Sequence, residues 1–334
     1  MDNSAIGPLS KRAIDYCWRQ LAIRAGHKQA LSIQSGFESL GLPVYYLPLN
    51  QVPPGQPALV VIPCSPDSWD KALKMSPDSL RWLDPPQVFP PGYSPLWNEP
   101  IPAIFWGQGF ERGLKPFAEH LQNGNVVIYV DILSSLLFMF SRWEESVISE
   151  RDEHDRFRAE NSLAWKQKFL DLPIIDYYAL ILRAWIETLV PSWKPDTNTF
   201  TVKATYDIDN VTPLKGPKMA VRAFGRDLFK LQDIGKAMGT LKDIAYQVVA
   251  PARTTSFRGI FHLAELSQKT GVQSAFYFMA AEPGPFDNGY SPESPFIKQC
   301  ILSLQDQGFE IGLHASYRSL NDPARLASEK ARLD

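Results

Sequence analysis

Three side chains suited to hydrolytic chemistry follow predicted strands in the last third of the chain. Asp207 and Asp209 close a strand predicted over 201–207, and His314 follows another over 309–313. In parallel α/β proteins, ligand sites are built at the carboxyl ends of the strands, and we expect these two strands to be neighbours so that the three side chains converge. One of the two carboxylates could ligate a cation there, while the other accepts a proton from water that the cation has acidified. Carboxylate and imidazole together are a plausible start to a zinc site.

Each of these residues can also be interpreted as purely structural. Asp-x-Asp followed by Asn210 can be turn chemistry, because Asp and Asn hydrogen-bond their own backbone in loops. A lone His is more often a surface or satisfied core residue than a ligand. His154, in the charged run 150–156, suggests a metal site, although a solvated connecting segment is the more usual outcome. His262 falls on a polar helical face and Cys300 on an apolar one, so we interpret them as solvated and buried respectively.

Composition excludes several classes of function. The chain has 334 residues, is 45% hydrophobic and 21% charged, and carries a net charge of −2, as an ordinary globular protein of two domains would. The first 200 residues carry 18 Lys and Arg against 22 Asp and Glu, and the last 134 carry 16 against 14. Neither part is a basic surface for nucleic acid. No signal peptide or membrane span is predicted, and three scattered cysteines indicate no disulfide framework. We therefore expect a cytoplasmic protein, and the oligomeric state stays open.

The pattern of elements predicts an α/β domain over residues 1–195. A helix is expected over 10–25, and short strands over 43–49, 58–63, 101–106 and 126–130. Between them, 84–93 is rich in Pro and must be irregular. Helices are expected over 115–123, closed by Gly124, over 131–145, and after Pro173. The segment 191–196 breaks that last helix and gives the boundary between the domains.

The second domain, residues 196–334, alternates strands and helices. Strands are expected over 201–207, 272–279 and 309–313, with helices over 259–270, 295–307 and from Pro323 onwards. Such spacing is typical of a parallel sheet or barrel. Because three parallel strands do not close a barrel, we interpret the domain as incomplete at its C-terminus.

Several short motifs resemble the NodB-like polysaccharide deacetylases. Thr205-Tyr-Asp-Ile-Asp209 looks like the first motif of that family, and Glu310-Ile-Gly-Leu-His-Ala-Ser-Tyr-Arg-Ser319 looks like the second. Gly271-Val-Gln-Ser-Ala-Phe-Tyr-Phe278 resembles the family's second strand. The first domain resembles an accessory domain that precedes a subset of these enzymes, through Ser141-Arg-Trp-Glu-Glu145 and Asp155-Arg-Phe157. The likeness covers nearly the whole chain.

The resemblance implies an α/β domain followed by the first part of a distorted (β/α) barrel, and metal-dependent removal of acetyl groups from sugars. By position, Asp207 would be the general base, and Asp209 and His314 would be ligands of a divalent metal, zinc first among them. Ser316 would shape the loop, with Asn210 and Arg318 in a supporting or substrate-binding place. The implied partner is a carbohydrate substrate, an amino-sugar polysaccharide or glycan precursor.

Two departures from the family pattern keep alternatives open. Arg318 stands where the family has a third ligand, a His, and a guanidinium cannot ligate a cation. The later motifs, which supply an Arg and a His acid, are not in these 334 residues. The sequence therefore allows three interpretations: a metal-dependent deacetylase, a catalytically impaired deacetylase-like protein that binds carbohydrate or an assembly partner, and, more weakly, an interaction module formed by the N-terminal domain.

Overall fold

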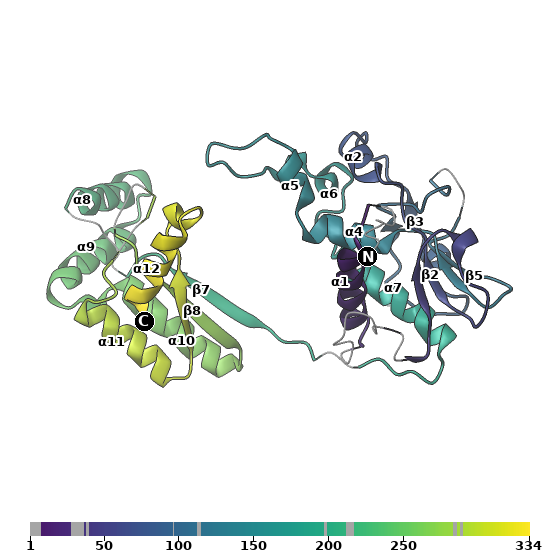
Figure 1. Ribbon diagram of the computed structural model, residues 1–334. Coiled ribbons are helices and arrows are strands. Elements are labelled where there is room, and N and C mark those ends of the chain that lie inside the picture. Colours follow the sequence, from purple (N-terminus) through teal and green to yellow (C-terminus); the bar gives the residue numbers. More distant parts are fainter. Residues whose placement is uncertain are drawn as a thin grey trace. The chain divides into compact units, whose positions relative to one another are not determined.

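The computed structural model shows a mixed α/β protein that divides into two compact units (Figure 1). Unit 1 comprises Met1–Asn198 and unit 2 Thr199–Asp334, so the division falls close to the boundary expected at 195. Within them, the structure describes residues 8–27, 37, 40–95, 97–111, 115–196, 199–211, 217–282, 286–287 and 290–334. Among these residues, no helix is long and apolar enough to cross a membrane.

Unit 1 is built on a four-stranded sheet in the order β1-β2-β6-β5, beside a two-stranded ribbon of β3 and β4. The strands β1, β2 and β6 run parallel, and β5 pairs with β6 antiparallel. The strands are β1 (Val44–Tyr46), β2 (Leu59–Val61), β3 (Trp82–Leu83), β4 (Ile101–Pro102), β5 (Ala118–His120) and β6 (Val126–Ile128). The helices are α1 (Lys11–Arg24), α2 (Ser68–Leu73), α3 (Pro85–Val88), α4 (Ile132–Phe140), α5 (Trp143–Val147), α6 (Leu163–Lys166) and α7 (Ile174–Leu189), with 3₁₀ turns η2 (Leu49–Gln51) and η3 (Ala159–Asn161).

Both faces of the unit 1 sheet are apolar, which explains its continuous runs of Val and Ile. Leu59 and Val61 face a large core that includes α1, α4 and α7, whereas Val60 faces a smaller cluster with Val127 and Tyr129. A strand points alternate side chains to opposite faces, so only a sequence that is apolar throughout can serve two cores. Figure 1 shows the three helices together beside the sheet.

Two predicted helices of unit 1 are wrong. Residues 115–123 form β5 and the start of a hairpin, because Gly124 (φ +87°) lies in the turn to β6 and not at a helix end. There the amide of Gly124 donates to the carbonyl of Leu121 at 2.9 Å. The helix expected over 131–145 is broken, because Arg142 has a left-handed backbone (φ 52°) between α4 and α5. The strand expected over 101–106 is reduced to β4, followed by an isolated bridge at Trp106.

Unit 2 contains an open, parallel, three-stranded sheet in the order β7-β8-β9. The strands are β7 (Lys203–Ile208), β8 (Gln273–Met279) and β9 (Glu310–His314). The helices are α8 (Pro217–Gly225), α9 (Ile234–Val249), α10 (Thr255–Thr270), α11 (Pro295–Asp306) and α12 (Pro323–Leu333), joined by a π-helical turn η4 (Arg226–Lys230) and 3₁₀ turns η5 (Pro251–Arg253) and η6 (Tyr317–Ser319). Over the described residues the three strands do not close into a barrel. The helices α8 and α9, in a stretch for which the sequence predicted no element, are the main addition.

One face of the unit 2 sheet carries its core. Ile208, Phe276 and Phe278 pack there with Phe257 and Ile260 of α10 and with apolar residues of α11. Cys300 belongs to this cluster, as expected, and His262 is exposed on α10. The side chains of alternate positions, Asp207 and Tyr277 among them, therefore point to the opposite face. The N-termini of α11 and α12 follow the helix-capping rules. Ser294 and Asp322 are their N-cap residues, and each is followed by Pro at the first helical position.

A buried carboxylate joins two strand ends in unit 1. Asp131 is fully buried and accepts hydrogen bonds from the amides of Cys64 (2.8 Å) and Ser134 (2.9 Å) and from the Tyr46 hydroxyl (2.7 Å). Burial raises the pKa of this carboxyl above its ordinary value. Its bond to Ser134 caps α4, so its role is to hold that helix to the sheet.

We expect Asp131→Ala to destabilise unit 1 by about 2–4 kcal/mol, because two buried amides and a hydroxyl would lose their acceptor. All nine tryptophans lie in unit 1, so urea unfolding followed by tryptophan fluorescence reports on this unit alone. Asp67→Ala, which removes an exposed carboxylate, is the matched control and should change the midpoint little. Equal effects of the two substitutions would contradict the capping role.

We also expect chymotrypsin to separate the two units. Residues 199–202 are exposed, and the Phe200 side chain is 88% exposed. Brief digestion should give two resistant fragments cut after Phe200, and Phe200→Ala should suppress that cut. Early cleavage throughout residues 1–198, with no persistent fragment, would show that unit 1 does not fold by itself.

Candidate active site

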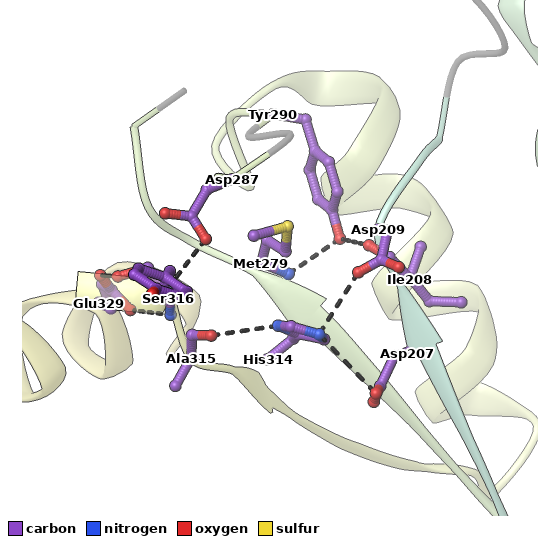
Figure 2. A network of polar contacts seen from close by, with 11 residues as sticks. Asp207, Ile208, Asp209, Met279, Asp287, Tyr290, His314, Ala315, Ser316 and Glu329 are labelled. Carbon is purple, nitrogen blue, oxygen red and sulfur yellow. Dashed lines mark hydrogen bonds and ion pairs between the residues drawn. The ribbon is translucent and has the colours of Figure 1, made fainter. Parts of the chain in front are cut away.

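The carboxyl ends of β7 and β9 bring Asp207, Asp209 and His314 together (Figure 2). The Nε2 atom of His314 lies 3.3 Å from Oδ1 of Asp209 and 3.7 Å from Oδ2 of Asp207. We expected the strands that carry these residues to be neighbours, and that expectation is wrong. β8 lies between β7 and β9, and His314 reaches across the sheet from its position in register with Met279.

The three side chains are open to solvent. The side chains of Asp207 and Asp209 are 62% and 55% exposed, and that of His314 is 28% exposed. The desolvation cost of the two carboxylates is therefore small, and no further buried partner is required to offset it.

A backbone contact sets the orientation of the His314 ring. The Nδ1 atom of His314 lies 3.2 Å from the carbonyl oxygen of Ala315. A carbonyl can only accept, so Nδ1 carries the proton in this bond, and Nε2 is the ring nitrogen that faces the carboxylates. A lone pair facing two carboxylates is repelled unless a proton or a cation lies between them. This is the arrangement by which metal-binding imidazoles are commonly held.

The donor set fits a divalent cation in part. For bonds of about 2.1 Å, two ligands of a tetrahedral zinc lie about 3.4 Å apart, close to the distance between Asp209 and His314. Among the described residues, however, no three His, Cys, Asp or Glu side chains are grouped so as to hold a metal ion. His154, in the charged run, is likewise in no such group. Two protein ligands are fewer than the three usual in catalytic zinc sites.

The remaining predicted residues have different surroundings. Asn210 is exposed directly after the strand end. Ser316 is buried and donates its hydroxyl and its amide to the carboxylate of Glu329 in α12, so its side chain is not available to a ligand. Arg318 is exposed on η6, and within the described part of the chain no hydrogen bond or ion pair joins it to Asp207, Asp209 or His314.

Sequence reasoning missed the residue that ties the strand ends together. The Tyr290 hydroxyl donates to the carbonyl of Ile208 (2.6 Å) and accepts from the amide of Met279 (2.9 Å), as Figure 2 shows. Burial, with a smaller effect from the nearby charge of Asp209, raises the pKa of this hydroxyl, which keeps it protonated. A tyrosine in a loop rich in Gly and Pro carries no sequence signal for such a role.

A second missed group fixes the loop that follows His314. Glu329 is the residue of α12 that is buried, although it is charged, and it holds Ser316 as described. Asp287 accepts from the amide of Tyr317 at 2.9 Å. Arg332, also on α12, donates to the carbonyl of Ala280 at 2.6 Å, next to the end of β8. The loop is therefore held by polar contacts from α12 and from the segment after β8.

Comparison with known proteins gives one match. The family described as a family of unknown function (DUF7033) matches residues 75–191, a minority of the chain that lies wholly within unit 1. This range includes the segments 141–145 and 155–157 that suggested an accessory domain. No curated protein and no solved structure gives a match.

We expect Tyr290→Phe to loosen the carboxyl end of the sheet, because the Met279 amide would lose its acceptor in a part-buried place. Hydrogen exchange at the Met279 amide should become at least about tenfold faster, equivalent to about 1.4 kcal/mol of local opening. Tyr246→Phe is the control, since no hydrogen bond of its hydroxyl is found among the described residues. An unchanged exchange rate of the Met279 amide in Tyr290→Phe would contradict the role of Tyr290 as a bridge between the strand ends.

Proposed function

We propose that this protein is a metal-dependent hydrolase that removes acetyl groups from an amino-sugar polysaccharide or glycan precursor. The observation that carries the proposal is the meeting of Asp207, Asp209 and His314 at the carboxyl end of a parallel sheet. The same residues stand in the motifs that resemble those of NodB-like deacetylases. On this proposal, unit 2 has the chain order of the first part of such a distorted barrel, and unit 1 is the accessory domain.

The residues divide the work by their positions. Asp209 and His314 would hold a divalent cation, zinc first among the candidates, which would supply the Lewis acidity that activates water and polarises an acetyl carbonyl. Asp207, which lies farther from His314 than Asp209 does, is the general base. Its exposed carboxylate can accept a proton from water attacking the acetyl carbon. The Ala315 carbonyl keeps the His314 ring in the tautomer that leaves Nε2 free.

A second function is favoured by Arg318. A positive, exposed side chain stands where the resemblance places a third ligand, and two protein ligands hold a cation weakly. The alternative is a deacetylase-like protein that has lost catalysis and binds carbohydrate or an assembly partner. The two functions differ in whether metal binding and acetyl hydrolysis depend on the same three residues.

Calorimetric zinc titration of variants separates the two functions. If the site binds zinc, Asp209→Ala should lower the affinity by at least about tenfold, since one of two ligands is lost. Arg318→His should raise it, because an imidazole replaces a cation that repels the metal. Asp207→Asn should change affinity little but abolish hydrolysis of an aryl acetate, which needs no sugar.

Asp306→Ala, an exposed carboxylate on α11, is the matched control and should behave as the wild type in both assays. Equal zinc affinity in all variants would place any metal elsewhere. Zinc binding at the site without hydrolysis in the wild type would favour the binding function over the enzyme.

A further inference from the structure

The helical segment 226–249 of unit 2, formed by η4 and α9, keeps large apolar side chains on its surface. The two elements pack against each other and against α8, and Figure 1 shows α8 and α9 next to each other at one edge of the unit. Among the described residues, none of this segment belongs to the buried core that α10 and α11 form with the sheet. The exposed apolar residues, which we call the apolar patch, are Phe229, Leu231, Ile234, Met238, Leu241 and Val249. Exposed apolar surface of this extent marks a site of interaction.

The members of the apolar patch on α9 form a single stripe. Met238, Leu241 and Val249 follow Ile234 by four, seven and fifteen residues, so their directions around the helix axis fall within a sector of about 80°. Ala237, outside the stripe, is buried, so α9 is packed on another side. Ile234 is 70% exposed, and Phe229 on the adjoining turn is 77% exposed. These side chains therefore project from the surface and do not line a groove.

The acidic residues of the segment are engaged within the fold. The buried carboxylate of Asp227 accepts from the Thr240 hydroxyl at 2.7 Å. Asp233 caps the first turn of α9. Asp243 accepts from the amide of Thr255, at the start of α10, at 2.9 Å. The negative charges of the segment thus connect its elements to each other and to α10.

The charges left beside the apolar patch are positive. Lys230 lies between Phe229 and Leu231, and Lys242 follows Leu241 at the edge of the stripe. Both lysines are exposed, and over the described part of the chain no ion pair joins either of them to an acid. Apolar side chains interleaved with free cations are the composition of surfaces that lie in the interface of a membrane.

The arrangement disfavours two other occupants. A second copy of this chain, packed by two-fold symmetry, would bring Lys230 and Lys242 close to their own equivalents, and like charges in an interface are repelled. A folded protein partner would need a matching pocket for each projecting side chain. An anionic bilayer meets both requirements without such matching, because its fluid acyl region accepts apolar side chains of any shape while its headgroups attract lysine.

We propose that η4 and α9 dock unit 2 on an anionic lipid surface. Phe229 and the stripe of α9 enter the boundary between headgroups and acyl chains, and Lys230 and Lys242 contact the anionic headgroups. The segment lies in the plane of the interface and does not cross the bilayer. The proposal stands independently of the proposed hydrolase, because none of these residues belongs to the candidate active site.

Cosedimentation of the 334-residue chain with lipid vesicles tests the docking surface. Vesicles of equal parts phosphatidylcholine and phosphatidylserine should bind it at least about fivefold more tightly than phosphatidylcholine alone, and added salt should weaken that binding. Phe229→Ser and Ile234→Ser should each weaken binding to the mixed vesicles at least about fivefold, through lost apolar burial. Lys230→Glu should weaken it by at least as much, through repulsion.

Two exposed residues of α11 provide matched controls. Leu302→Ser removes an exposed apolar side chain and Lys298→Glu reverses an exposed charge, both outside the segment. Each should bind the mixed vesicles within about twofold of the wild type. Circular dichroism of every variant checks that α9 is still folded, so that a loss of binding is not a loss of the helix.

The outcomes are distinct. Equal binding of the wild type to both kinds of vesicle, no binding to either, or wild-type binding by folded Phe229→Ser would overturn the proposal. So would self-association of the wild type that Phe229→Ser abolishes, measured by sedimentation equilibrium, if vesicles bind neither protein, because the occupant would then be a second copy. Zinc binding and aryl acetate hydrolysis use other residues, so the hydrolase can fail while the expected order of vesicle affinities holds, and the reverse.

Discussion

The parallel register of β7, β8 and β9 is the constraint on which the candidate site depends. All three strands end at one edge of the sheet, and this alone brings residues about a hundred positions apart in sequence into contact. The register also decides which face each side chain takes. A slip of one residue in β7 would move Asp207 into the apolar core and Ile208 out of it. Burial of Ile208, Phe276 and Phe278 therefore holds the polar residues in place, although none of these three side chains belongs to the candidate site.

A carboxylate at a strand end is not by itself a functional site, and the two units show why. Asp131 follows β6 in unit 1 much as Asp207 and Asp209 follow β7 in unit 2. In unit 1 both faces of the sheet are covered, so Asp131 is buried, its oxygens are engaged, and burial raises its pKa. In unit 2 the carboxylates at the end of β7 are left to solvent and to an imidazole. The covering of the sheet therefore decides whether the oxygens of such a carboxylate are engaged in the fold or stay accessible.

The sequence predicted the elements with strong local signals and missed those decided by tertiary contacts. The strands β7, β8 and β9 and the helices α10, α11 and α12 follow from apolar period, caps and closing glycines. The segment 115–123 has helical spacing, but pairing with β6 makes it a strand, since packing overrides a weak local preference. The ribbon strands β3 and β4 have only two residues each, too few to carry any period.

The candidate site was predictable in its residues but not in its arrangement. Asp207, Asp209 and His314 stand out because acids and a His follow apolar strands. The order β7-β8-β9 is not encoded in such a pattern, because the same spacing allows a crossover to place the third strand on either side of the first. Tyr290 and Glu329 could not be found either. Each is polar, and only the folded chain shows that its hydrogen bonds close at the strand ends.

The conformation of the loop after His314 is determined by contacts with α12 and not by the residues of the candidate site. Glu329 accepts hydrogen bonds from both the amide and the hydroxyl of Ser316, and Asp287 accepts one from the amide of Tyr317. With two successive amides held from outside the site, the next side chain, Arg318, is exposed on η6. The residue type at position 318 and the path of this loop are therefore separate determinants of the site. A metal-ligating side chain at position 318 would have to approach His314 without breaking the hydrogen bonds of Glu329. The buried carboxylate of Glu329 would be costly to leave without partners.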